Sequence, residues 1–126
     1  MRQDYQRALD KIAPSLASAG SHLTRLATKG KHVPPELMDK VKELGRRYNA
    51  AQHDMPESGN RVLIKELGLI EYLAERFAVL GSARDCIAKL ERAIDAGARQ
   101  FWMSVHFDDK IGFMREWSAQ VMPAFR

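Results

Sequence analysis

Residues 81–123 have the sequence GSARDCIAKLERAIDAGARQFWMSVHFDDKIGFMREWSAQVMP, which predicts a helix, a strand and a second helix in succession. Ser82, with Asp85 three residues later, forms a capping-box pair that starts the first helix. Gly97 occupies the position after a helix end where glycine is favoured. The buried faces are expected to carry Ile87, Leu90 and Ile94 in the first helix and Ile111, Met114, Trp117 and Val121 in the second.

The strand is expected at Phe101–Val105, which is apolar on both faces, as in a strand covered on both sides. Asp108 is expected to cap the helix that follows, and Pro123 to close it. A single strand cannot satisfy its own backbone hydrogen bonds, and the chain has no clear second strand. The strand therefore needs a copy in another chain, or partner strands that lie outside these residues.

The first part of the chain, residues 1–59, is predicted to be helical. Apolar residues from Tyr5 to Leu16 share one face of a helix over about residues 4–27, and Pro14 predicts a break or kink near Ile12 and Ala13. Pro34 and Pro35 open a second helix that extends to about residue 51. Two short helices, separated by a glycine, are expected at about 60–67 and 69–76.

The composition describes one globular domain, or part of a larger one, in 126 residues of which 45% are hydrophobic. No apolar run approaches the roughly 20 residues of a membrane span, and no signal-peptide core follows the N-terminus, so a cytoplasmic protein without a membrane partner is expected. The net charge is +4, but the basic residues are scattered, which does not favour a nucleic-acid partner. Cys86 is the single cysteine; it excludes an internal disulfide and a cysteine-built zinc site, and is expected to be buried.

Two groups of residues are candidates for a site. The carboxyl end of the predicted strand carries His106 and Asp109, at the place where α/β folds gather their ligands; the alternative is an ordinary loop residue beside a helix cap. Tyr48 and His53 lie five residues apart at a helix end and could line a pocket, although polar aromatics near a loop are common. The sequence has no zinc-protease, phosphate-loop, dinucleotide or nucleophile-elbow motif, so the catalytic residues are unknown and no metal is predicted.

The stretch ELGLIEYLAERFAVLGS, residues 66–82, and the segments after it resemble the C-terminal region of the bacterial luciferase-like monooxygenase family. This family includes flavin- and deazaflavin-dependent reductases of the methylenetetrahydromethanopterin reductase type. The resemblance covers about residues 30–126 and rests on the order and spacing of several short pieces. These pieces are Val33–Leu37, the pair Tyr48 and His53, Asn60, Arg76–Ala78, Gly81–Ser82, Ala96–Gly97, Phe101–Val105 and Val121–Arg126. The chain departs from the family at Ala83 and Arg84, where proline and glutamate are common.

The resemblance implies a (β/α)8 TIM barrel more than twice this length, of which residues 60–126 are the closing helix–strand–helix unit. It implies an oxidoreductase that transfers hydride or monooxygenates with FMN or the deazaflavin coenzyme F-420. Because the family holds its flavin mainly with earlier strands, the chain is expected to be inactive alone, with the missing barrel portion as its partner. Tyr48, His53 and His106 are the candidate cofactor-binding positions.

Two alternatives come from other classes of protein. One is a small helical homodimer that serves as an interaction module and pairs its Phe101–Val105 strand across a two-fold axis. The other is a weakly basic nucleic-acid-binding domain, for which affinity that falls steeply with salt is expected.

Overall fold

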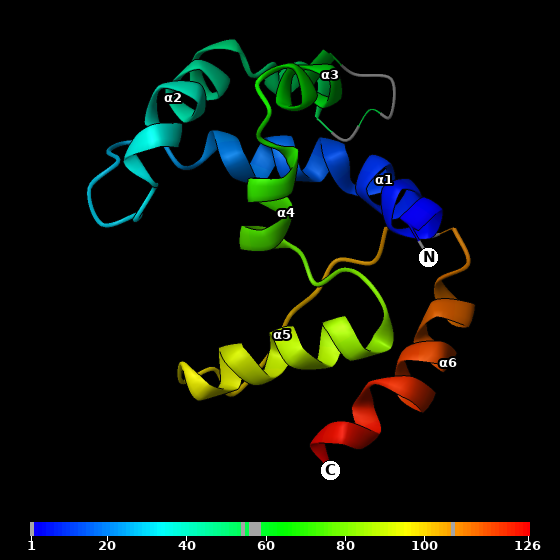
Figure 1. Cartoon of the computed structure of the whole chain (residues 1–126). Helices are drawn as coiled ribbons and strands as arrows, with labels where there is room; N and C mark the ends of the chain where they lie inside the picture. The colour runs from blue at the N-terminus through cyan, green and yellow to red at the C-terminus, as the bar shows by residue number, and fades with distance from the viewer. Residues whose placement is uncertain (1, 54, 56–58, 107) are drawn as a thin grey trace. The chain divides into compact units, whose positions relative to one another are not determined.

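A computed structural model describes residues 2–53, 55, 59–106 and 108–126, and in these residues the chain is mainly α-helical, without a strand (Figure 1). The mainly α class predicted from the sequence is thereby confirmed. The elements in chain order are α1 (Arg2–Ser21), η1 (Pro35–Leu37), α2 (Met38–Arg47), η2 (Ala50–Gln52), α3 (Gly59–Glu66), α4 (Ile70–Phe77), α5 (Ala83–Asp95), α6 (Lys110–Gln120) and η3 (Met122–Phe125). The chain divides into two compact units, residues 9–78 and residues 79–126 with 1–8. Each unit is described by itself.

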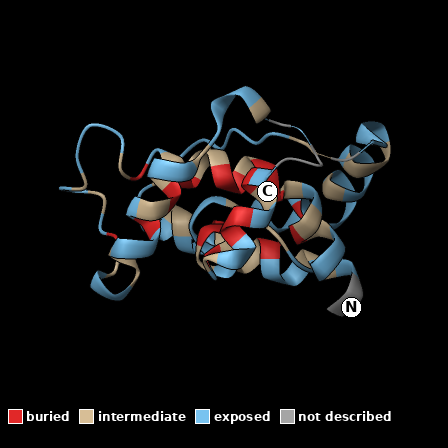
Figure 2. Ribbon diagram, turned by 90° about the horizontal axis from the view of Figure 1, so that it is seen from above, coloured by how far each residue is buried: buried red, intermediate tan, exposed pale blue. Residues whose placement is uncertain are grey.

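The unit Leu9–Ala78 has a closed apolar core (Figure 2). Its innermost large side chains, all without solvent exposure, come from α1, α2, α3, α4 and the turn before α4: Leu9, Val41, Leu44, Ile64, Leu69 and Leu73. Gly20 of α1 lies against two of them, since a Cβ atom there would stand 2.7 Å from Leu44 and 3.0 Å from Leu73. The missing side chain at Gly20 thus lets α1 approach both α2 and α4 closely.

Helix α1 continues through Pro14, so of the break or kink predicted near Ile12 and Ala13 the break does not occur. Proline removes one backbone hydrogen bond, but Ala13 and Ala17 on either side of it are fully buried, and packing of that face outweighs the loss. The helix ends at Ser21, six residues earlier than expected. Beyond it, the Lys31 ammonium group donates to the carbonyl oxygens of His22 and Arg25, at 2.7 and 2.6 Å.

The two short helices predicted around a glycine are present as α3 and α4. Gly68 has φ +66°, and the amides of Gly68 and Leu69 donate to the carbonyl oxygens of Lys65 and Ile64 at 3.0 and 2.9 Å. This is the Schellman pattern, which needs a left-handed residue at that place. The Lys65 ammonium group also contacts the Asp10 carboxylate, which ties α3 to α1.

In the second unit, the local signals for α5 are confirmed. Ser82 and Asp85 form the full capping box, with the Asp85 amide 3.2 Å from the Ser82 hydroxyl and the Ser82 amide 2.9 Å from the Asp85 carboxylate. At the other end Gly97 has φ +108°, and the amides of Gly97 and Ala98 donate to the carbonyl oxygens of Ile94 and Ala93, both at 2.9 Å. Capping at both ends explains why this helix has the predicted bounds.

The core of this unit is small. Cys86 and Leu90 of α5 pack with Val121 after α6, and a few half-buried side chains, among them Ile87 and Trp117, surround them. The Trp117 ring also packs on Phe113, with 5.5 Å between ring centroids. Val121 is the innermost of the residues expected on the buried face of α6, at 3% exposure.

Two predictions for this unit are wrong, and the predicted strand stays a prediction. Among the described residues Phe101–Val105 forms no strand, and its backbone makes no hydrogen bond to any of them; its partner strands were expected in another chain or outside these residues. Ile111 and Met114 are 60% and 57% exposed rather than buried, since the core of the unit covers only one side of α6. The cap of α6 is Asp109 and not Asp108, with the Gly112 amide donating to its carboxylate at 2.8 Å.

Across the residues that the structure describes, every helix is either too short or too polar to cross a membrane.

Candidate functional site

The structure joins Tyr48 and His53, which the sequence proposed as a pair. Tyr48 terminates α2 in an extended conformation, and its amide donates to the Leu44 carbonyl oxygen at 2.9 Å. His53 follows the single turn of η2, which brings its ring back toward α2. The Tyr48 hydroxyl and His53 Nδ1 then lie 2.9 Å apart, in a hydrogen bond whose donor depends on the imidazole tautomer. Tyr48 is half-buried and His53 exposed, so the pair faces solvent.

A buried amide holds the base of this turn in place. Asn60 is 3% exposed at the start of α3, and its side chain accepts from the Asn49 amide at 2.9 Å and donates to the Asn49 carbonyl oxygen at 2.8 Å. Asn49 in turn accepts from the Ala51 amide at 3.0 Å through its own side chain, which caps η2. The two bonds to the Asn49 backbone fix where the chain leaves α2, and with it the place of Tyr48.

The turn is also closed at its far end, where the Gly59 amide donates to the Gln52 side-chain oxygen at 3.2 Å. A hydrogen-bonded phenol and imidazole can exchange a proton, and the two together present a polar, aromatic edge to a ligand. Both groups are held by backbone geometry and by Asn60 and not by an enclosing pocket. The arrangement therefore suits contact with a ligand that other groups bind, more than it suits a complete site.

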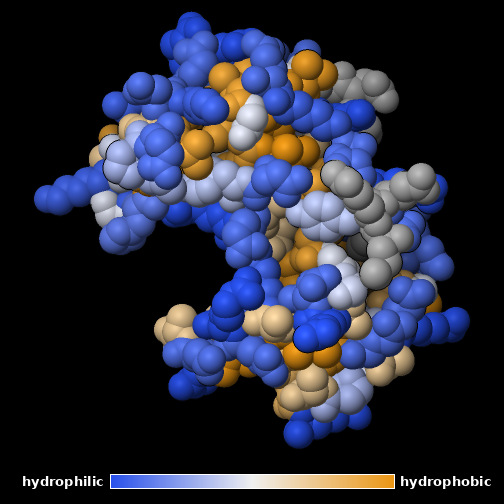
Figure 3. All heavy atoms as spheres, in the orientation of Figure 1, coloured by the Kyte–Doolittle hydropathy of each residue, from blue (hydrophilic) through white to orange (hydrophobic). Residues whose placement is uncertain are grey.

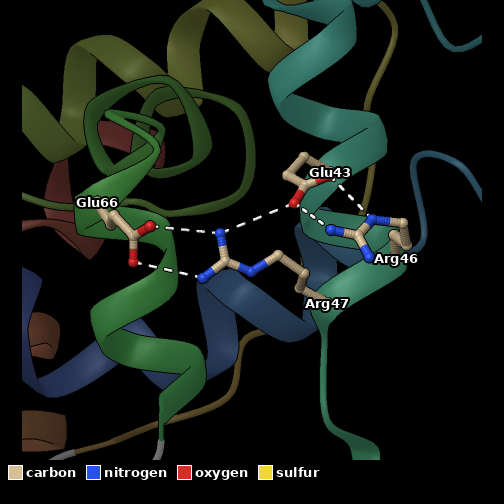
Figure 4. Close-up of polar contacts among 4 residues, drawn as sticks. All are labelled: Glu43, Arg46, Arg47 and Glu66. Atoms are coloured by element: carbon tan, nitrogen blue, oxygen red, sulfur yellow. Dashed lines mark hydrogen bonds and ion pairs between the residues drawn. The ribbon is translucent and has the colours of Figure 1, made fainter.

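Charged side chains link α2 to α3 beside this turn (Figure 4). Arg47 lies 3.3 Å from the Glu66 carboxylate on α3 and 3.8 Å from that of Glu43 on its own helix. Arg46 also holds Glu43, with hydrogen bonds of 3.0 and 2.5 Å, and these bonds lower the pKa of the Glu43 carboxyl below its ordinary value. The positive charges of Arg46 and Arg47 are thus compensated locally.

Sequence reasoning gave Arg76 no structural role, but it is a central contact of this unit. Its guanidinium group donates to the carbonyl oxygens of Lys31 and His32, at 2.5 and 3.5 Å, and to the Tyr72 hydroxyl at 3.1 Å. It also lies 5.5 Å from the centroid of the Phe77 ring. These contacts fasten the loop after α1 to α4 across more than forty residues, so no local pattern could have predicted them.

The remaining candidates lie in the second unit. His106 is half-buried in the segment before α6, and Asp109 serves as the helix cap described above. Cys86 is buried as predicted, and burial is the main reason that the pKa of its thiol is raised. A thiol with a raised pKa is a poor nucleophile near neutral pH, which agrees with a packing role.

One described surface of this unit is hollowed. A shallow depression, open to solvent, runs along α6 and is lined by Ile111, Met114, Arg115, Ser118 and Ala119. It offers one cationic group on an otherwise mostly apolar floor. Within the described part of the chain, no three histidine, cysteine or carboxylate side chains gather in a way that would hold a metal ion.

Comparison with known proteins found no match to the chain among protein-family models, curated proteins or solved structures.

Proposed function

We propose that this chain is the C-terminal portion of a luciferase-like, flavin- or deazaflavin-dependent oxidoreductase, and that Phe101–Val105 becomes a barrel strand when the rest of the barrel is present. The order of segments over residues 66–126 carries the family resemblance. The described elements are compatible with it: α5 begins at Ser82 and ends before Gly97, an extended apolar segment follows, and α6 comes next.

The observation that supports the proposal most is the distribution of apolar residues on α6. Trp117 packs against the small core and Phe113 packs on Trp117, whereas Ile111 and Met114 are exposed. Figure 3 shows hydrophobic surface in the region of α5 and α6. A helix that is apolar on more than one side is typical of one covered by more than one neighbour. In a barrel, each outer helix packs both on the sheet and on the adjacent helices, which would cover these residues.

The parent reaction would be hydride transfer or monooxygenation through FMN or the deazaflavin coenzyme F-420, whose ring supplies the redox chemistry. The described surfaces of this chain do not fit such a ring by themselves. The depression on α6 is open and shallow, and the Tyr48–His53 pair faces solvent, whereas a flavin needs a concave site that buries most of its surface. No step of the reaction is therefore assigned to these residues, and the chain alone is proposed to be inactive.

Two measurements test this proposal. Sequencing the genomic DNA directly upstream of the Met1 codon is expected to show an in-frame, barrel-coding stretch; an in-frame stop codon without such a stretch would refute the proposal. Titration of the isolated chain with FMN and with F-420, followed by fluorescence, is expected to show no stoichiometric binding. Tight binding by the chain alone would contradict the claim that the cofactor site lies mainly in the missing portion.

A nucleic-acid-binding role has less support from the contacts of the basic residues. The Lys31 ammonium group is bound to two carbonyl oxygens, and Arg46 and Arg47 face carboxylates. Lysine and arginine side chains that are already bound to oxygen atoms of the protein contribute less to phosphate binding. Affinity for DNA or RNA at low salt that falls steeply as salt is added would restore this function.

A further inference from the structure

The segment Phe101–Val105 presents unused hydrogen-bonding groups and apolar side chains together. Its backbone makes no hydrogen bond to a described residue, and Phe101, Trp102 and Met103 are 41%, 87% and 45% exposed. The segment contains neither proline nor a charged residue, the two features with which proteins usually block an open strand edge. It is therefore suited to pair with another extended chain.

The charges around this segment indicate which chain that is. Arg99 precedes the uncharged residues, and Asp108 and Asp109 follow them. If a second copy lies antiparallel, the basic end of each segment is near the acidic end of the other. If it lies parallel, like charges meet at both ends, which destabilises a strand pair. The sequence is thus complementary to itself in the antiparallel orientation.

We propose that two copies of this chain associate through Phe101–Val105 as an antiparallel strand pair. Residues alternate between the two faces of such a pair, so Phe101, Met103 and Val105 of each copy meet on one face and Trp102 packs on the other. This inference goes beyond the proposed function, because it concerns the chain as it stands and involves no cofactor. In a complete barrel, strands of the same polypeptide would occupy this edge, and they would run parallel to it.

The size of the segment predicts a weak dimer. A standard stable interface buries about 800 Å² on each partner, and large aromatic side chains contribute roughly 150–250 Å² apiece when fully covered. One short strand with two aromatic residues stays below that standard. We expect a dissociation constant on the order of micromolar or weaker, so dimers form only as the protein is concentrated.

Sedimentation velocity of the full chain over a roughly hundredfold range of concentration tests this. The mass is expected to rise from that of one chain toward that of two. Trp102→Ser should prevent the rise without changing the helical circular dichroism, because Trp102 makes little contact within its own chain. A wild-type chain that stays monomeric, or a Trp102→Ser chain that still dimerises equally well, would overturn the proposal.

The antiparallel orientation is tested by reversing charges. Arg99→Glu places acidic residues at both ends of the segment, and Asp108→Arg places a basic residue near Arg99 of the other copy; each variant alone is expected to self-associate roughly tenfold more weakly. A mixture of the two variants restores opposite charges at both ends and should dimerise as the wild type does. Unchanged dimerisation of Arg99→Glu would contradict the antiparallel pair. Neither result depends on flavin binding or on the upstream gene, so this inference and the proposed function can fail separately.

Discussion

The unit Leu9–Ala78 and the unit built from α5 and α6 differ in the size of the apolar core that each forms. In the first, four helices contribute to a core in which six large side chains have no solvent exposure. In the second, the described core has three buried residues, Cys86, Leu90 and Val121. Large apolar side chains that are more than half exposed occur in both units: Leu26, Met55 and Val62 in the first, and Trp102, Ile111 and Met114 in the second. The two units lie in one chain of ordinary composition. The difference teaches that a unit's own core can supply much of the stability in the first unit and less of it in the second, where the capping of the helices matters more.

The largest expected effect comes from shortening a fully buried side chain in the core of the unit Leu9–Ala78. Leu44→Ala should lower the free energy of unfolding by about 3 kcal/mol, because the fully buried side chain packs beside Gly20 and leaves a cavity. Urea unfolding followed by circular dichroism measures it. The matched variant in the other unit is Leu90→Ala, for which we expect a smaller loss, since its cluster is small and partly open. An equal or larger loss for Leu90→Ala would remove the difference between the two cores.

The next effect concerns the buried amide of the closed unit. Asn60→Ala should cost about 2 kcal/mol, because it leaves both the amide and the carbonyl oxygen of Asn49 without their partner. It should also alter the Tyr48–His53 hydrogen bond, which the histidine ring resonances in an NMR spectrum report.

The control for this variant is Asn49→Ala. It removes only the exposed side-chain cap of η2 and leaves the backbone bonds to Asn60 intact, so it should cost less than about 1 kcal/mol. If the two substitutions cost the same, the buried amide is not what holds this turn.

In the second unit, where packing contributes less, the capping box of α5 should be a larger share of the stability. Ser82→Ala removes the acceptor for the Asp85 amide and should cost about 1 kcal/mol. Urea unfolding monitored by tryptophan fluorescence, in a Trp102→Phe background so that Trp117 beside the α5 cluster gives the signal, measures the loss in this unit. A loss below measurement error would show that α5 is held by its packing and not by its cap.

A smaller effect of the same cap depends on pH. Hydrogen bonds from the Ser82 side chain and backbone lower the pKa of Asp85 below its ordinary value of 3.8. The folded state therefore binds a proton at Asp85 less readily than the unfolded state does. The stability that the ionised Asp85 carboxylate contributes is complete above its ordinary pKa and is lost as pH falls through the lowered pKa. The stability difference between wild type and Asp85→Asn should shrink accordingly in acid, as urea unfolding at several pH values would show. A stability difference between the two proteins that does not change with pH would contradict the claim that the hydrogen bonds from Ser82 lower the pKa of Asp85.

The sequence predicted the parts of this fold that depend on local chemistry. The cap at Ser82 and the glycines after the helix ends, Gly68 and Gly97, lie where they were expected, because each involves residues within a few positions of one another. The helix does not break at Pro14, because packing of the whole α1 face outweighs one lost hydrogen bond. Periodicity likewise predicted that Ile111 and Met114 are buried, but it carries no information on which side of α6 another segment of the chain covers.

The candidate site shows the same limit. Tyr48 and His53 were paired because they are near in sequence, and their hydrogen bond follows from the intervening turn. The Asn60 contacts span eleven residues and those of Arg76 more than forty, so they depend on how the helices pack and have no local signal. No finding tests the family resemblance or a role for His106, and both stay predictions.

The smallest expected effect is at the ion pair between α2 and α3. Glu66→Gln removes the charge that faces Arg47, but both side chains are partly exposed, at 56% and 39%, so the loss should be about 0.5 kcal/mol at low salt. Because salt screens exposed charges, the loss should vanish near 1 M salt, where the screening length is about 3 Å. Glu91→Gln on α5 is the matched control in the open unit, since the structure shows no ion pair between Glu91 and another described residue. A loss of stability that does not depend on salt would mean that the Glu66 side chain acts through packing and not through its charge. The stability of the unit Leu9–Ala78 would then come still more fully from its apolar core.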